Sequence, residues 1–104
     1  MAEFDCIFQA MSDRTRQKIL LLLQEHSRCV RDLVDQFHLS QPTISKHLLT
    51  LKNAGLVCDE RRGNHVIYSL DHDSIRELAG FFQKFHCCSS LFENENISVK
   101  RITD

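Results

Sequence analysis

Hydrogen-bonding side chains gather on one face of the segment from Ser40 to Asn53. Ile44, Leu48 and Leu51 stand at i, i+4 and i+7, the spacing of one apolar side of an α-helix. The other side carries Gln41, Thr43, Ser45, Lys46, His47 and Lys52. Nearly all of these groups can donate hydrogen bonds to phosphates or base edges, so the segment predicts a helix that contacts DNA. For any single residue, the alternative is an ordinary solvated helix face.

Two arginines follow this helix at the tip of a predicted β-hairpin. Short β-like runs cover residues 56–60 and 65–70, and Arg61-Arg62-Gly63-Asn64 joins them. A Gly-Asn pair between such runs is typical of a hairpin turn. The two arginines place positive charge where a phosphate backbone would pass. A polar helix followed by a hairpin with a basic tip is typical of a winged helix-turn-helix.

Thiols offer a second kind of chemistry, because the chain has five cysteines: Cys6, Cys29, Cys58, Cys87 and Cys88. The number is odd, and the chain opens without the basic and apolar regions of a secretory signal. We therefore expect a cytoplasmic protein without a disulfide framework. Metal binding, redox chemistry and packing remain as roles for the thiols. Cys58 lies on the first hairpin run, where core packing is the simplest expectation.

Helices must position these groups. Four further helices are predicted, and they begin near Phe4, at Ser12 or Asp13, at Arg28 and after the N-caps of residues 71–74. The third helix ends at Phe37, and residues 38–40 form the tight turn that leads into the DNA-contacting helix. Ser40 caps that helix, and Gly55 ends it because glycine accepts a left-handed conformation. The fold class is a mainly α winged helix-turn-helix of five helices plus a two-stranded wing.

Composition fits a single soluble domain. The chain has 104 residues, and we expect the folded domain over residues 1–92 and a polar C-terminal tail over 93–104. The longest apolar run, Ile19–Leu23, is far too short to span a membrane. Net charge is only −1, yet the span from Arg14 to Arg62 holds nine Lys or Arg and five acids. A basic middle between acidic ends fits a DNA-facing surface.

The last predicted helix is wider in its apolar face than packing on one neighbour requires. Ile75, Leu78, Phe82 and Phe85 stand at i, i+3, i+7 and i+10. Together with the amphipathic first helix, this face predicts a homodimer interface. The alternative is that both helices simply cover the core of a monomer.

Three blocks of the chain resemble the ArsR/SmtB family of bacterial winged-helix repressors. The blocks are MSDRTRQKILLLL, CVRDLVDQFHLSQPTISKHLLTLKNAGLV and ERRGNHVIYSL, and the resemblance runs from about Phe4 to Leu70. It implies a dimer, paired through the first and last helices, that binds a palindromic double-stranded DNA operator and releases it when an effector binds. Arg14, Arg16 and Lys52 would then be phosphate contacts or surface charges.

The resemblance also implies roles for the polar residues of the helix and the wing. Gln41, Thr43, Ser45, Lys46 and His47 would face the major groove, while Arg61, Arg62 and Asn64 on the wing would reach the flanking backbone or minor groove. Glutamine with adenine and lysine with guanine are the plausible bidentate base contacts, each worth about 1–3 kcal/mol of discrimination.

The effector motifs of relatives are incomplete in this chain. The arsenic-sensing pattern CVCDLC corresponds to residues 29–34, CVRDLV, so only Cys29 matches and Arg31 replaces the second cysteine. The zinc-sensing histidines of the last helix correspond to Asp73, Lys84 and Cys87, and a protonated lysine is a poor zinc ligand. The cysteine pair that senses persulfide is half missing, because the second helix offers only leucines.

One constellation of thiols remains. Cys87 and Cys88 are adjacent, follow His86, and would approach Cys6 if the first and last helices pack together. Thiolates suit arsenite, antimonite, Cd(II) or Cu(I), and binding at a dimer interface would couple to its geometry. The alternative is that these cysteines are small buried hydrophobic residues. Cys29 is open to packing or to a ligand role.

These observations predict a transcriptional repressor released from its operator by an effector, most simply a thiophilic metal or metalloid. The alternative is the same DNA-binding dimer without metal sensing, controlled by redox or persulfide chemistry, by its own level or by a partner protein. A winged helix used for protein contacts would carry an apolar or acidic recognition face. No enzyme is expected, because the sequence lacks a Gly-rich phosphate loop and an activated nucleophile pattern.

Overall fold

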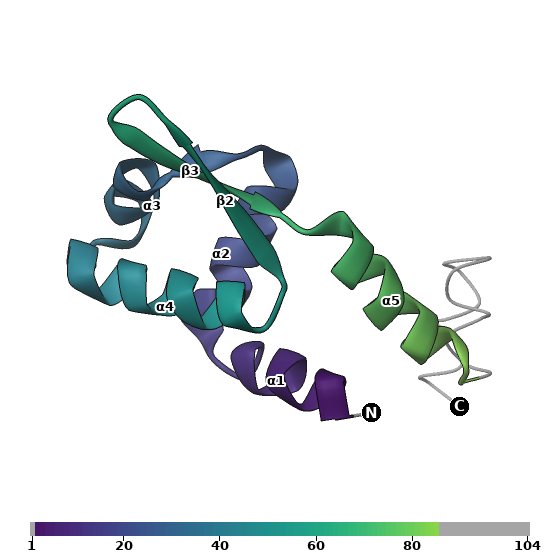
Figure 1. Ribbon diagram of the computed structural model, residues 1–104. Helices are drawn as coiled ribbons and strands as arrows, with labels where there is room; N and C mark the ends of the chain where they lie inside the picture. Colours follow the sequence, from purple (N-terminus) through teal and green to yellow (C-terminus); the bar gives the residue numbers. More distant parts are fainter. Residues whose placement is uncertain (1, 86–104) are drawn as a thin grey trace. The chain divides into compact units, whose positions relative to one another are not determined.

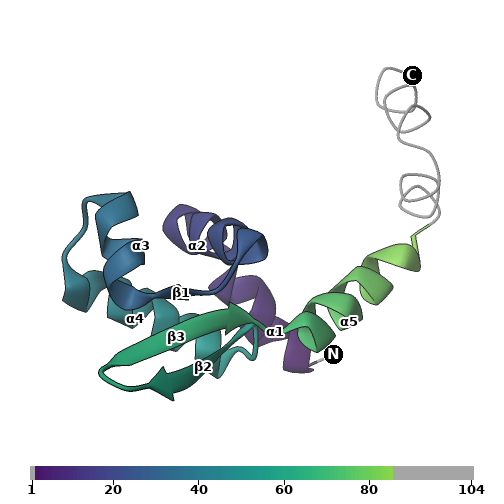
Figure 2. The same ribbon diagram turned by 90° about the horizontal axis from the view of Figure 1, so that it is seen from above.

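The computed structural model describes residues 2–85, with side chains from Phe4 onward. The elements follow one another as α1 (Ala2–Ala10), α2 (Arg14–Glu25), β1 (Arg28–Cys29), α3 (Val30–Phe37), α4 (Gln41–Asn53), β2 (Val57–Arg62), β3 (His65–Leu70) and α5 (His72–Gln83). They form two compact units, the first reaching to Ser74 and the second beginning at Ile75. In the first unit, the turn of the β2–β3 hairpin and the N-terminal end of α4 lie at the same end, beside α3 (Figures 1 and 2).

The predicted helix starts are confirmed where a capping side chain precedes the helix. The Asp13 carboxylate accepts a hydrogen bond from the backbone N–H of Arg16 at 3.0 Å, and α2 begins at the next residue after the cap. Ser40 Oγ accepts from the backbone N–H of Thr43 at 3.3 Å, with Pro42 in the first turn of α4. Asp71 Oδ1 accepts from the backbone N–H of Ser74 at 3.2 Å at the start of α5.

Two left-handed residues shape the helix-turn-helix. His38 ends α3 with φ of 56°, so the turn into α4 is made by a non-glycine residue in the left-handed region. Gly55 follows α4 with φ of 81°, as predicted. Its N–H donates to Lys52 O at 2.9 Å, and the N–H of Leu56 donates to Leu51 O at 3.0 Å. This pair of bonds is a Schellman ending, which turns the chain from the helix directly into the wing.

The wing contains a third strand that the sequence did not indicate. The sheet order is β1-β3-β2, and Arg28 and Cys29 pair with Tyr68 and Ile67 of β3. The prediction that α3 begins at Arg28 and that the wing has two strands was therefore wrong. Arg28 is held in the extended segment because its buried side chain binds Leu22 O at 3.1 Å and Glu25 Oε1 at 2.7 Å. A two-residue strand has no periodicity that a sequence pattern would reveal.

The hairpin is tighter than predicted. β2 continues through both arginines, Arg62 pairs with His65, and only Gly63 and Asn64 form the turn. Gly63 has φ of 62°, which suits the first position of a two-residue hairpin turn. Only Val57 of β2 is buried, whereas Cys58 and the rest of the strand are exposed, so the predicted core position of Cys58 was wrong.

The core of the first unit is aliphatic and includes the predicted stripe of α4. The largest fully buried side chains are Ile19, Leu33, Ile44, Leu48, Leu51 and Leu56. Three of the six belong to α4, so burial fixes which way this helix is turned about its axis. The helix is thereby oriented with its polar side outward.

In the second unit, α5 ends at Gln83, earlier than the predicted apolar pattern that ran to Phe85. Lys84 and Phe85 donate to Phe81 O and Phe82 O, at 3.2 and 3.1 Å, which are i to i−3 bonds of a tightened last turn. The Phe81 ring contacts those of Phe82 and Phe85, at centroid distances of 5.5 and 5.7 Å. None of the helices in the described chain is long and apolar enough to cross a membrane.

Candidate nucleic-acid interface

The N-terminal half of α4 presents polar side chains to solvent. Gln41, Thr43, Ser45 and Lys46 are exposed, while Ile44 between them is fully buried. The Thr43 hydroxyl lies 2.9 Å from Ser40 Oγ. In the described part of the chain, the side chains of Gln41, Ser45 and Lys46 make no hydrogen bond or ion pair. These three groups keep their full hydrogen-bonding capacity for an external partner.

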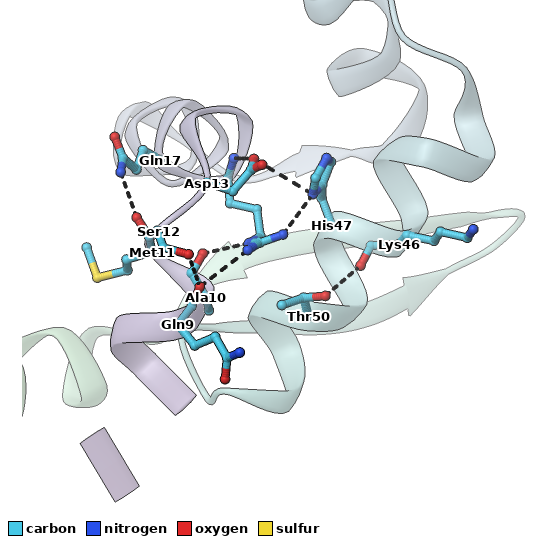
Figure 3. Close-up of polar contacts among 10 residues, drawn as sticks. Gln9, Ala10, Met11, Ser12, Asp13, Gln17, Lys46, His47 and Thr50 are labelled. Atoms are coloured by element: carbon cyan, nitrogen blue, oxygen red, sulfur yellow. Dashed lines mark hydrogen bonds and ion pairs between the residues drawn. The ribbon is translucent and has the colours of Figure 1, made fainter. Parts of the chain in front are cut away.

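His47 differs from these neighbours because it already has partners within the protein. Its side chain is 19% exposed, and its Nδ1 lies 3.2 Å from Arg16 Nη1 and 4.0 Å from Asp13 Oδ2 (Figure 3). The pKa of the Asp13 carboxyl is lowered, first by the hydrogen bond from the Arg16 backbone and then by the nearby His47. A DNA contact by His47 stays a prediction, and the structure turns one of its ring nitrogens inward.

The wing carries its charge on exposed side chains. Arg61, Arg62 and Asn64 are all exposed. Arg62 Nη2 lies 3.0 Å from Glu60 Oε1, and both side chains are about two-thirds exposed at 68% and 67%, so this ion pair is weak. Arg61 has no ion pair among the described residues. Arg61 is therefore the wing cation with the least internal compensation.

A third cation lies between the wing and α4, and the sequence argument missed it. A hollow of about 200 Å³ is lined by Cys29, Val30, Arg31, Gln41, Asn64, His65 and Val66. Arg31 is exposed and has no hydrogen bond or ion pair within the described chain. In the sequence, Arg31 stands out only as one of nine basic residues between Arg14 and Arg62 and as the replacement of a cysteine, because its closeness to the hairpin turn depends on the pairing of β1 with β3.

Other cations near this face are internally paired. Lys52 Nζ lies 3.1 Å from Asp59 Oδ2 and joins the end of α4 to β2. Tyr68 stands opposite Asp59 in the hairpin, where burial and then the Asp59 charge raise the pKa of its hydroxyl. Arg16, also predicted as a phosphate contact or surface charge, has hydrogen bonds to α1 and α4 instead of open solvent around its guanidinium.

The predicted thiol site falls mainly outside the described residues, since Cys87 and Cys88 lie beyond Phe85. Cys6 is exposed on α1 and lines a hollow of about 350 Å³ with Gln9, Ala10, Arg16, Thr50, Asn53 and Ala54. Cys29 is half-buried beside Arg31. Among residues 4–85, the structure groups no three His, Cys, Asp or Glu side chains that could hold a metal ion. The predicted site at Cys87, Cys88 and Cys6 stays a prediction.

Comparison with known proteins decides the family. Residues 13–58, which include α2, α3 and α4, match the family model described as bacterial regulatory protein, arsR family. The transcriptional repressor SdpR of Bacillus subtilis is 40% identical over 82 residues, which cover 75% of this chain and 91% of SdpR. This chain belongs to the ArsR family.

Further regulators are similar to this chain in sequence or fold. The repressor SmtB of Mycobacterium tuberculosis is 46% identical over 67 residues, which cover 64% of this chain and 50% of SmtB. The structure of HlyU from Vibrio cholerae matches with a TM-score of 0.68 and 27% identity, covering 83% of this chain and 94% of HlyU. Other relatives are named for arsenical resistance in Staphylococcus xylosus and for cadmium resistance in Staphylococcus aureus. The predicted winged helix-turn-helix fold and family are thus confirmed.

Proposed function

We propose that this ArsR-family regulator is a homodimeric repressor that reads its operator with the N-terminal half of α4 and holds the DNA backbone with its wing. One observation carries the proposal: Gln41, Ser45 and Lys46 are exposed and have no partner among the described residues, and neither has Arg61 on the wing beside them. Base edges and phosphates are the ligands that such a set of amide, hydroxyl and cationic groups recognises. Arg31 extends the cationic surface between the two elements.

The proposal assigns two kinds of contact to these groups. Gln41 and Lys46 make base contacts in the major groove, with Thr43, Ser45 and His47 on the same helix face. Arg61, Arg62, Asn64 and Arg31 contact the backbone, or the minor groove next to it. Base contacts create sequence preference, whereas phosphate contacts position the protein and make its affinity depend on salt.

Fluorescence anisotropy with DNA from the region upstream of the chain's own gene tests this proposal. Wild-type protein should bind this DNA more tightly than a shuffled duplex of equal length. Arg61→Ala/Arg62→Ala should weaken binding on both duplexes and flatten the salt dependence, because phosphate contacts release counterions. Equal wild-type affinity for both duplexes at every salt concentration would contradict an operator-binding function.

We further propose that an effector bound by thiols releases the operator. The support is the set of Cys87, Cys88 and Cys6, together with relatives named for arsenical and cadmium resistance. Thiolates bind arsenite, antimonite, Cd(II) and Cu(I), and a site shared between helices or subunits would change the spacing of the two α4 helices. A coupling free energy of about 1–3 kcal/mol would lower operator affinity by about fivefold to about 150-fold.

The effector proposal has its own experiment. The preformed complex is titrated with arsenite, Cd(II), Zn(II) and a persulfide donor, and release should disappear in a Cys87→Ser/Cys88→Ser variant. Cys58→Ser is the matched control, because Cys58 is an exposed thiol on the wing that the proposal does not use. Release that persists in Cys87→Ser/Cys88→Ser would move the site elsewhere. Tight binding that none of these compounds releases would favour the same dimer without thiol sensing.

A further inference from the structure

Arg16 joins three helices through one guanidinium group. It lies in the first turn of α2, where its Nε donates to Ala10 O at 2.6 Å and its Nη2 donates to Gln9 O at 3.3 Å. Its Nη1 lies 3.2 Å from Nδ1 of His47 on α4. The carbonyls belong to the C-terminal end of α1, so a single side chain connects α1 to the DNA-contacting helix.

The guanidinium is well suited to this position. The last carbonyls of a helix lack intrahelical partners and carry partial negative charge, which a cation stabilises. The backbone of Arg16 is itself fixed, since its N–H donates to the capping carboxylate of Asp13. A guanidinium has only donors, so the hydrogen bond between Arg16 and His47 requires that Nδ1 of His47 is the acceptor.

Arg16 differs from the cations of the candidate DNA interface because it is hydrogen-bonded within the protein. Arg61 and Arg31 are exposed and have no partners within the described chain. Arg16 is half-buried and directs Nε, Nη1 and Nη2 to acceptors inside the protein. A phosphate contact by Arg16 would compete with these bonds.

We propose that Arg16 is a positioning residue for operator recognition, which fixes α4 against the end of α1 through His47. The inference rests on the proposed DNA-binding function and deepens it. In this proposal the hydrogen bonds of Arg16 connect α1 directly to α4. A displacement of the C-terminal end of α1 therefore changes the positions of Gln41 and Lys46 relative to the bases. The link uses only backbone carbonyls of α1, and it therefore responds to the position of that helix and not to its side chains.

The salt dependence of binding separates positioning from phosphate contact. Arg16→Met keeps an unbranched stem of similar size to the aliphatic part of arginine and removes the guanidinium with its donors. We expect it to lower operator affinity by about tenfold, because a less restricted α4 must be ordered on binding, while the slope of log affinity against log salt stays at the wild-type value. Affinity for shuffled DNA should also stay unchanged. Arg61→Met is the matched control, and its slope should fall by about one.

Substitutions of His47 test the same link from its other end. His47→Phe keeps a ring but removes the acceptor, and it should lower operator affinity about as much as Arg16→Met. His47→Gln retains an acceptor and should recover part of that loss. In the Arg16→Met/His47→Phe double variant the two losses should overlap instead of multiplying, because both break one connection. Thermal unfolding of each variant identifies a loss that comes from unfolding, and His47→Phe carries the test if Arg16→Met does not fold.

The outcomes distinguish this inference from the proposed function. Wild-type protein that shows no preference for the upstream DNA overturns the operator-binding function itself. Wild-type preference combined with an Arg16→Met slope reduced by about one, on operator and shuffled DNA alike, makes Arg16 a phosphate contact and overturns only the positioning role. Independent, multiplicative losses in the double variant also overturn the positioning role, because they assign Arg16 and His47 to separate contacts.

Discussion

The two halves of α4 carry similar polar residues and use them differently. In the N-terminal half, Gln41, Ser45 and Lys46 are exposed and without partners in the described chain. In the following half, His47 is hydrogen-bonded to Arg16 and Lys52 forms an ion pair with Asp59 of the wing. The first half is available to a ligand, and the second is bound to α2 and to β2.

A small domain can present a binding surface on one half of a helix and hold the helix by the other half. A helix whose polar residues were all free would rest on its apolar stripe alone. Here the second half attaches α4 to its neighbours on both sides of that stripe, which restricts the helix before any ligand arrives. A helix that is already held in place loses less conformational entropy on binding, so we expect the bonds of His47 and Lys52 to raise the affinity of the exposed half for a ligand.

The largest expected effect comes from removing the support that both halves share. Leu48→Ala empties a fully buried position on α4 and should lower the free energy of unfolding by about 2–5 kcal/mol, through lost burial and the remaining cavity. Urea denaturation measures this change. Leu49→Ala is the control on the same helix, since Leu49 is 55% exposed, and its effect should stay within about 0.5 kcal/mol. Equal losses at the two positions would contradict the orientation of α4.

A smaller effect, on binding alone, is expected from the free half. Lys46→Ala should cost about 1–3 kcal/mol of discrimination at one base pair of the operator, because a bidentate base contact is lost. The free energy of unfolding should barely change, since the Lys46 side chain touches no partner within the described chain. Anisotropy on operators with single base-pair changes measures the discrimination. A uniform loss on every sequence would instead assign Lys46 to the phosphates.

A still smaller effect is expected at Asp13, the N-cap of α2, which holds the backbone of Arg16 in place. Asp13→Ala removes the acceptor of the Arg16 N–H and should lower the free energy of unfolding by about 0.5–2 kcal/mol at neutral pH. The pKa of Asp13 is lowered in the folded protein, so its contribution is present above the unfolded pKa and is lost as pH falls through the folded one. The difference between wild type and Asp13→Ala should therefore shrink in acid, as urea titrations over a pH series would measure. A difference that grows in acid would contradict this role.

The smallest effect is expected at the ion pair between α4 and the wing. Lys52→Ala should change the free energy of unfolding by at most about 1 kcal/mol, because the Lys52 and Asp59 side chains are 47% and 28% exposed and water screens the pair. A double-mutant cycle with Asp59→Asn isolates the interaction. Its coupling energy should fall further in high salt. A large coupling energy that does not change with salt would contradict this expectation. It would show that the Lys52–Asp59 pair holds α4 to the wing more strongly than the exposure of the two side chains indicates.

Local chemistry explains which parts of the fold were predicted. Ser40, Asp13 and Gly55 act on backbone groups within a few residues of themselves, so their roles follow from sequence spacing. The stripe of α4 follows from helical periodicity in the same way. β1 depends on its pairing with β3, which is distant in the chain, and the exposure of Cys58 depends on which part of the sheet the core covers, so neither followed from local spacing.

In the candidate site, too, some features follow from local spacing and others from contacts between distant parts of the chain. The helix-turn-helix, the polar face of α4, the basic wing and the family can be predicted from the sequence, because each rests on spacing within a short segment. Tertiary structure alone decided which polar residues of that face are free. Arg16 meets His47 across thirty-one positions of sequence, and Arg31 meets the hairpin turn only through β1. A side chain's availability depends on the acceptors that the fold brings to it, and these come from distant parts of the chain.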